Sequence, residues 1–172
     1  MPISDPITAE TSEGRQFACF PAAVLVALVD PEQRVLLLRS PTRWGGWEVI
    51  NGALEHGETV LQGCLRELAE EAGSTVRARP LGVVHVQTIV YDTRIPPLLS
   101  ICYVMEYLGG DIVPGDDMAG SEWRWFTIDE ILARDLQLDV PGEKWVVQRA
   151  VELYGLWHDR RVPPLDAARQ LK

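Results

Sequence analysis

The sequence predicts a single domain of mixed α/β class. Of its 172 residues, 47% are hydrophobic and 24% are charged, which is the composition of an ordinary globular domain. Short runs rich in valine, leucine and isoleucine indicate strands, and longer segments repeat apolar residues with the period of a helix. Because these segments alternate along the chain without a repeat or a linker, we expect one layered α/β domain.

The first half of the chain is predicted to form a strand hairpin behind a loose arm. Residues 1–16 are polar, and we expect them to form that arm, ahead of a domain over residues 17–160 and a tail over residues 161–172. Residues 22–29 read as a buried strand, which turns at Asp30-Pro31 and returns over residues 35–39. A short strand over residues 47–50 and a loop rich in glycine and acid follow.

The clearest helix is predicted between Thr59 and Ala72. Thr59 and Gln62 form a capping box at its start, and Gly73 is a natural stop. An apolar stripe recurs along it at spacings of four, three and four residues, made of Leu61, Leu65, Leu68 and Ala72. This stripe is typical of a helix that packs on a sheet.

The second half adds three strands and two helices. Two long strands are predicted over residues 81–91 and 98–107, joined through Pro96-Pro97. A loop rich in glycine and aspartate leads to a strand over residues 123–126. Thr127 and Glu130 then cap a short helix that reaches about residue 133, and a second long helix covers residues 143–159.

Charge and cysteine content exclude several classes of protein. The net charge of −9 argues against binding of a nucleic-acid polymer, which needs clustered lysine and arginine. The three cysteines, Cys19, Cys64 and Cys102, are widely spaced, so neither a disulfide framework nor a zinc site is expected. The sequence shows no signal peptide and no membrane-spanning run. We therefore expect a cytoplasmic protein without a membrane contact.

The chemistry is predicted at the end of the first helix. Glu67, Glu70 and Glu71 stand at positions i, i+3 and i+4, so their carboxylates share one face of a helix, away from its apolar stripe. Like charges this close are unfavourable unless cations neutralise them, and Mg²⁺ or Mn²⁺ prefers carboxylate ligands. Gly52 allows close approach of backbone to a metal or substrate, and Arg66 can fix a carboxylate in a fork geometry.

This stretch resembles the signature of the Nudix hydrolase family. That signature is a glycine, five residues, a glutamate, seven residues, and then Arg-Glu-aliphatic-x-Glu-Glu-x-Gly-aliphatic. The fixed positions are matched by Gly52, Glu58, Arg66, Glu67, Leu68, Glu70, Glu71 and Gly73, and Ser74 departs from the final aliphatic position. The resemblance implies an α/β/α sandwich with a mixed sheet over residues 20–155. It also implies Mg²⁺- or Mn²⁺-dependent hydrolysis of a nucleoside diphosphate linked to another group, and homodimers are common in the family.

The resemblance also suggests a role for each residue. Glu67 and Glu71 are the leading metal ligands, with Glu70 a third and the Gly52 carbonyl a fourth, while Arg66 orients the cluster through Glu58 or Glu67. The general base is Glu67 or Glu70 on the helix, or Glu122 just before a later strand. Asp116 and Asp117, in the same loop, fit turn formation better. The alternative is a ligand-binding module that keeps the fold without turnover.

The substrate is a small phosphorylated nucleotide whose identity the sequence leaves open. Trp44, Trp47 and Tyr91 could stack on a base, although packing is the common role of aromatic residues at such positions. Arg39 and Arg43 precede the signature and could meet a phosphate, but exposed arginines are ordinary. A nucleotide sugar, a dinucleoside polyphosphate and a nucleoside triphosphate all remain candidates.

Overall fold

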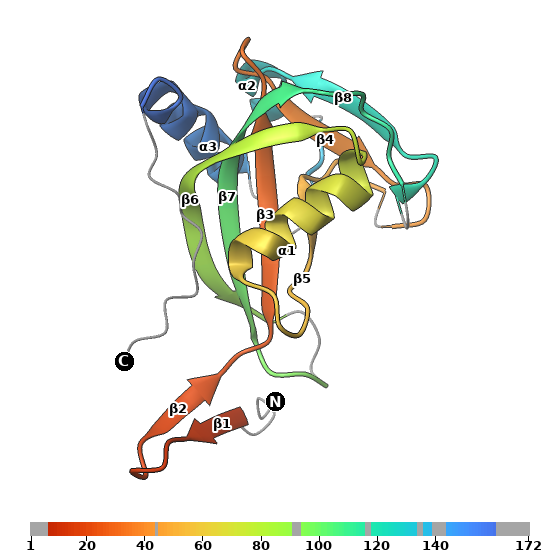
Figure 1. Ribbon diagram of the computed structural model, residues 1–172. Coiled ribbons are helices and arrows are strands. Elements are labelled where there is room, and N and C mark those ends of the chain that lie inside the picture. Colours follow the sequence, from red (N-terminus) through yellow and green to blue (C-terminus); the bar gives the residue numbers. More distant parts are fainter. Residues whose placement is uncertain are drawn as a thin grey trace.

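The computed structural model describes residues 7–43, 45–90, 94–115, 118–133, 136–138 and 144–160 (Figure 1). Its main sheet has six strands in the order β6-β7-β3-β4-β8, with β5 paired to β3. The elements of this domain are β3 (Ala22–Val29), β4 (Val35–Arg39), β5 (Ile50–Ala53), α1 (Val60–Glu67), η1 (Leu68–Ala72), β6 (Arg77–Ile89), β7 (Leu98–Gly109), β8 (Glu122–Phe126), α2 (Ile128–Leu132) and α3 (Lys144–Trp157).

Strand β3 is the centre of the fold. It pairs antiparallel with β4 and β5 and parallel with β7, so the sheet is mixed. Successive side chains of a strand point to opposite faces, and those of β3 divide between two hydrophobic clusters. One cluster lies beneath α1, and the other contains the buried residues of α3 and α2. Helices therefore cover both faces of the sheet, and the predicted α/β/α sandwich is confirmed.

Most predicted elements coincide with observed ones. The β3–β4 hairpin has the predicted bounds, and the capping box of Thr127 and Glu130 is present ahead of α2. The short strand predicted over residues 47–50 is wrong in its bounds, because β5 begins only at Ile50, while Trp47 and Glu48 form isolated bridges to Leu138 and Leu38. Within the described parts of the chain, no helix is long and apolar enough to cross a membrane.

The N-terminal segment differs from the loose arm expected over residues 1–16. Strands β1 (Ile7–Glu10) and β2 (Gln16–Cys19) pair antiparallel and form a separate two-stranded sheet, which projects from the domain in Figure 1. The polar composition hid a local turn signal. The hydroxyl of Thr11 accepts hydrogen bonds from the backbone amides of Glu13 and Arg15, which closes the turn.

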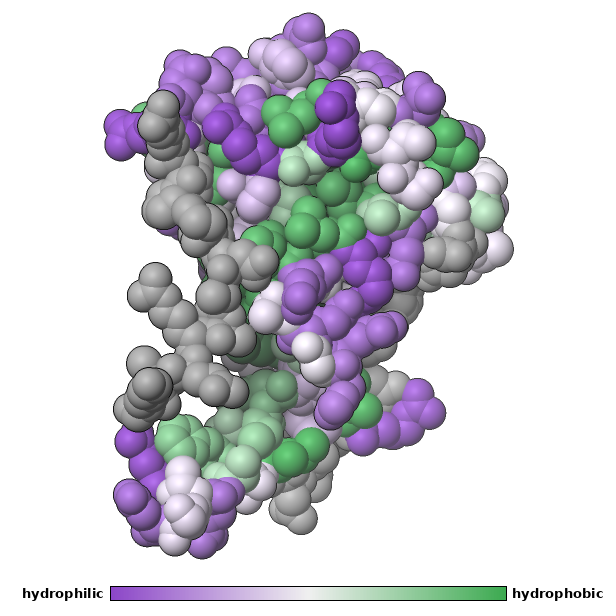
Figure 2. All heavy atoms as spheres, in the orientation of Figure 1, coloured by the Kyte–Doolittle hydropathy of each residue, from purple (hydrophilic) through white to green (hydrophobic). Residues whose placement is uncertain are grey.

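Helix α1 packs on the sheet through a stripe that differs by one residue from the predicted one. Leu61, Cys64 and Leu68 are buried, whereas Leu65 is 40% exposed. Cys64 stands three residues after Leu61 and four before Leu68, so it lies on the line between them. Leu65 lies to one side of that line. Figure 2 shows hydrophobic residues gathered near the middle of the face that is viewed in Figure 1.

The helix ends in a wider π-helical turn, η1, which a distant loop caps. The carbonyl of Glu70 accepts a hydrogen bond from Gly115 N at 3.1 Å, and that of Ala72 accepts one from Val113 N at 2.8 Å. Gly73 follows with a φ of 126°, which a residue with a side chain rarely adopts. The loop that leads to β8 is thereby fixed against the helix of the predicted site.

Thr59→Ala should destabilise the protein by about 1 kcal/mol, because the Thr59 hydroxyl accepts a hydrogen bond from Gln62 N in the observed capping box. Urea denaturation followed by circular dichroism measures the loss. Thr59→Ser keeps the hydroxyl and is the matched control. Equal unfolding midpoints for the two variants would show that the capping bond contributes nothing.

Candidate active site

The carboxylate of Glu67 lies directly against the backbone of strand β5. A Cβ atom added to Gly52 would stand 1.9 Å from Glu67 Oε1, so any side chain at position 52 would displace that carboxylate. Glu67 is only 7% exposed despite its charge. The close approach that the sequence predicted for Gly52 is therefore made to this glutamate.

Arg66 joins four acceptors around the helix. Its Nε and Nη2 atoms donate to the two oxygens of Glu58 at 2.8 and 3.1 Å, and Nη2 also donates to the Ala53 carbonyl. Its Nη1 donates to Glu67 at 2.7 Å and to Glu70 at 2.9 Å. The bond from Arg66 lowers the pKa of Glu58, and the bond to Glu58 raises the pKa of Arg66. Arg66 thus contacts both residues that were alternatives for its predicted orienting role, Glu58 and Glu67.

Glu71 points inward from η1 and is 1% exposed. Its Oε2 accepts a hydrogen bond from Asn51 N at 2.9 Å, and its Oε1 accepts one from Arg43 Nη2 at 2.7 Å. The three glutamates thus lie in different surroundings. Glu67 and Glu71, one turn apart, both face β5, while Glu70 is partly exposed beside Arg66.

Burial dominates the acidity of Glu71. It raises the pKa of this carboxyl group to about 7, and the negative charge of Glu67 acts in the same direction. The hydrogen bonds from Asn51 and Arg43 oppose the shift without cancelling it. Removal from water disfavours the charged form, so Glu71 holds a proton more readily than an exposed glutamate does.

A hard divalent cation fits the chemistry of these donors. Carboxylate and carbonyl oxygens are the ligands that Mg²⁺ and Mn²⁺ prefer, and the tight approach of Gly52 to Glu67 brings a backbone strand to the carboxylates. Within the described ranges, no three histidine, cysteine, aspartate or glutamate side chains are placed to hold one ion together. In this conformation Arg66 occupies the space between Glu67 and Glu70.

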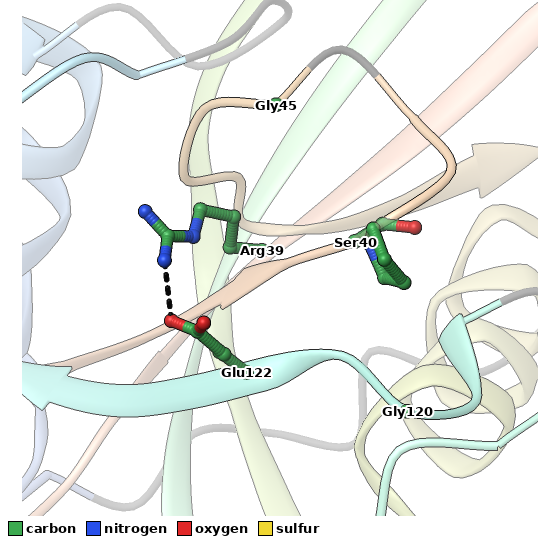
Figure 3. A pocket seen from close by; sticks show the side chains of 6 residues that line it. Arg39, Ser40, Gly45, Gly120 and Glu122 are labelled. Atoms are coloured by element: carbon green, nitrogen blue, oxygen red, sulfur yellow. Dashed lines mark hydrogen bonds and ion pairs between the residues drawn. The ribbon is translucent and has the colours of Figure 1, made fainter.

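Glu122 lies on strand β8 and pairs with a residue of β4. It opens β8 opposite Arg39 of β4, and its carboxylate accepts a hydrogen bond from Arg39 Nη2 at 2.6 Å (Figure 3). The pair borders an open pocket of about 310 Å³, lined by Arg39, Ser40, Pro41, Gly45, Gly120 and Glu122. The side chain of Glu122 is 63% exposed and is available to a molecule that enters this pocket.

Of the three predicted stacking residues, the structure describes one. Trp47 packs edge-to-face on Phe126 at 4.8 Å between ring centroids, and the Arg39 guanidinium lies over its ring at 5.2 Å. Trp47 therefore supports the pocket wall from within the core. Trp44 and Tyr91 lie outside the described residues, as do Asp116 and Asp117.

Sequence reasoning missed a buried acid beside the site. Glu48 is 3% exposed, and its Oε2 accepts hydrogen bonds from Arg43 Nη1 at 3.2 Å and from Asn51 Nδ2 at 3.1 Å. The sequence signal for this buried acid was the position of Glu48, two residues before the strand that contains Gly52. A charged residue next to apolar Trp47 and Val49 needs a partner when it is buried.

Fold and site together describe an α/β sandwich that carries acidic residues on one helix of its mixed sheet. The model of the NUDIX domain matches residues 20–149. The chain belongs to the Nudix family.

Relatives in sequence span more than one kind of Nudix protein. The chain is 29% identical over 131 residues to an NAD-capped RNA hydrolase, NudC, from Pseudomonas aeruginosa, with 76% of this chain and 42% of that protein covered. It is 27% identical over 106 residues to an ADP-ribose pyrophosphatase from Methanocaldococcus jannaschii, with 60% of this chain and 61% of that protein covered. The chain thus spans about two fifths of the length of the NudC relative.

Solved structures show the same fold at lower identity. A NUDIX hydrolase from Nitrosomonas europaea superposes with a TM-score of 0.60 at 21% identity, covering 80% of this chain and 90% of the other. An ADP-ribose pyrophosphatase from Streptococcus suis gives a TM-score of 0.61 at 18% identity, covering 78% of this chain and 91% of the other. These likenesses establish the architecture.

The raised pKa of Glu71 predicts how the stability of the metal-free protein changes with pH. Between its ordinary pKa of 4.5 and its folded value of about 7, the folded state keeps a proton that the unfolded state loses. The stabilising contribution of this group is therefore complete below pH 4.5 and falls as pH rises to 7, by roughly 2–3 kcal/mol.

Urea titrations in EDTA at several pH values test this change, with Glu71→Gln as the reference that cannot titrate. The difference in unfolding free energy between wild type and this variant should shift against the wild type as pH rises from 4.5 to 7. A difference that stays constant over this interval would contradict the assignment.

Proposed function

We propose that the protein is a divalent-metal-dependent pyrophosphohydrolase that acts on a nucleoside diphosphate linked to another group. The observation that carries this proposal is the packing of Glu67 and Glu71 against β5, with Arg66 joining Glu67 to Glu70 and Glu58. Relatives named for NAD-capped RNA and for ADP-ribose support a substrate that contains a pyrophosphate bond.

The chain's own groups divide the work. Glu67, Glu70 and Glu71 would hold Mg²⁺ or Mn²⁺, with the Gly52 carbonyl as a further ligand, and Arg66 would fix the direction of Glu67 and Glu70. When bound, the cation supplies Lewis-acid stabilisation of charge on the phosphate oxygens. Water attacks phosphorus, a carboxylate accepts its proton, and the bridging P–O bond breaks so that the second phosphate leaves.

Two locations remain candidates for the general base. Glu67 and Glu70 stand at Arg66, beside the proposed metal ligands. Glu122 lies at the start of β8, where it is paired with Arg39 and lines the pocket. Either location would supply a carboxylate that accepts the proton of the attacking water.

The pocket between Arg39 and Glu122 is the place proposed for the group linked to the diphosphate. It offers a guanidinium and a carboxylate side by side, so a group with both hydrogen-bond acceptors and donors would fit. Trp47 is not proposed to stack on a base, because Arg39 already covers its ring. Trp44 and Tyr91 stay as stacking candidates.

A panel of nucleoside diphosphate derivatives tests the activity. Incubation with Mg²⁺ or Mn²⁺ should release two phosphorylated products from at least one of ADP-ribose, NAD, a dinucleoside polyphosphate, a nucleotide sugar or a nucleoside triphosphate, as resolved by chromatography. Turnover should stop in EDTA and return with added metal. Binding without turnover of any panel member would instead support the ligand-binding module.

Glu67→Gln should lower kcat by about 100-fold or more, because it removes a charge from the carboxylate that lies against Gly52. Steady-state kinetics measure the loss, and an unchanged urea midpoint shows that the fold survives. Glu152→Gln, on the exposed side of α3, changes the net charge equally and should keep wild-type rates.

Glu122→Gln distinguishes the two candidate bases. If the base is on the helix, this variant should change KM for the panel substrate more than kcat, because Glu122 would contact the linked group. The kcat–pH profile decides: loss of its acidic limb together with a fall in kcat of about 100-fold would place the base on β8 instead.

A further inference from the structure

We infer that Arg43 is a positioning residue for the catalytic helix, a fork anchored on Glu48 that holds the carboxylate of Glu71 in place. This inference rests on the proposed role of Glu71 as a metal ligand. Arg43 and Glu48 precede the signature motif in the sequence. The residues that hold Glu71 in place therefore lie outside the family pattern.

The contacts form a closed ring. Arg43 Nη1 donates to Glu48 Oε2 at 3.2 Å, and Arg43 Nη2 donates to Glu71 Oε1 at 2.7 Å. Asn51 closes the ring from β5, with its side-chain amide on Glu48 at 3.1 Å and its backbone amide on Glu71 at 2.9 Å. The other hydrogen of the Asn51 amide group can reach the Val49 carbonyl at 2.8 Å. Both oxygens of Glu71 are thereby fixed in direction.

Burial makes this ring necessary. The side chains of Glu48 and Glu71 are 3% and 1% exposed, while that of Arg43 is 21% exposed. Two carboxylates removed from water need a cationic partner, because an unpaired buried charge costs several kcal/mol. A planar guanidinium can bridge both acids at once, whereas the ammonium of a lysine is a single point charge.

The anchor on Glu48 implies that Arg43 stays in place when a cation binds. If Arg43 moved away, Glu48 would remain buried with the Asn51 amide as its neutral donor. Each carboxylate oxygen has two lone pairs, so Glu71 can accept from Arg43 and still present a lone pair to a metal. Arg43 therefore stays bound to Glu71 when a metal binds. It supports metal binding and is not displaced by the metal.

The same loop also forms the wall of the pocket. Ser40 and Pro41 line it, and the hydroxyls of Ser40 and Thr42 are hydrogen-bonded at 3.1 Å. Arg43 follows directly and reaches back to the helix. Residues 40–43 therefore connect the position of the pocket to that of Glu71.

Mn²⁺ affinity of the 172-residue chain, measured by isothermal titration calorimetry at one fixed pH, tests the inference without any substrate. Arg43→Gln should weaken Mn²⁺ binding by about 10-fold or more, the usual effect of removing a partner that orients a metal ligand. Arg43→Lys should recover only part of this loss, because it restores the charge but not the bridge. Glu48→Gln should weaken binding in the same direction, and it keeps the side-chain shape if Arg43→Gln fails to fold.

Arg34→Gln is the matched control. Arg34 pairs with Asp30, whose side chain is 3% exposed, at the turn between β3 and β4, so this variant also strips a cation from a buried acid. It should lower stability and leave Mn²⁺ affinity within about twofold. Unchanged or tighter Mn²⁺ binding in Arg43→Gln would overturn the inference, and full recovery in Arg43→Lys would overturn the bridging geometry.

These outcomes are separable from those of the proposed function. A wild-type protein that binds Mn²⁺ but hydrolyses no panel member would contradict the activity, while the Arg43 comparison would still be decided by affinity. A wild-type protein that turns over substrate, with Arg43→Gln equal to it in both kcat and Mn²⁺ affinity, would overturn the positioning role alone.

Discussion

The structure depends on the burial of two carboxylates from one helical segment against a single strand. Glu67 and Glu71 are 7% and 1% exposed, and charged groups in such surroundings are strongly destabilising unless they are paired. Glycine at position 52 admits the first carboxylate, and the backbone amide of Asn51 meets the second. The register of β5 on β3 and the placement of the helix are consequently fixed together.

Two arginines stabilise these buried carboxylates. Arg66, on the helix itself, ties Glu67 to Glu58 and Glu70, and Arg43, from a loop before the strand, ties Glu71 to Glu48. Each guanidinium hydrogen-bonds to more than one carboxylate, because this planar group carries several donors. Without bound metal the site is therefore held by internal ion pairs rather than by solvent.

The sequence predicted the individual strands and helices because these depend on local patterns, and the resemblance to the Nudix signature implied the sandwich. Strand β3 is a run of apolar residues, and the capping boxes at Thr59 and Thr127 each join two residues three positions apart. Both patterns can be recognised within a short stretch of sequence. What could not be predicted depends on partners far apart in the chain. The inward turn of Glu71 needs Arg43, 28 residues away, and the exposure of Leu65 depends on how the whole helix is rotated on the sheet.

The π-helical turn at Leu68–Ala72 lies where the helix contacts strand β5 and the loop ahead of β8. Glu67 and Glu71 stand four residues apart, a spacing that keeps both carboxylates on one side of a helix, and that side faces β5. The carbonyls of Glu70 and Ala72, in the last turn of the helix, accept hydrogen bonds from the loop ahead of β8. The end of this helix thus brings together the buried acid, the strand beneath it and the loop that leads to Glu122, and π-helical turns are frequent at functional sites.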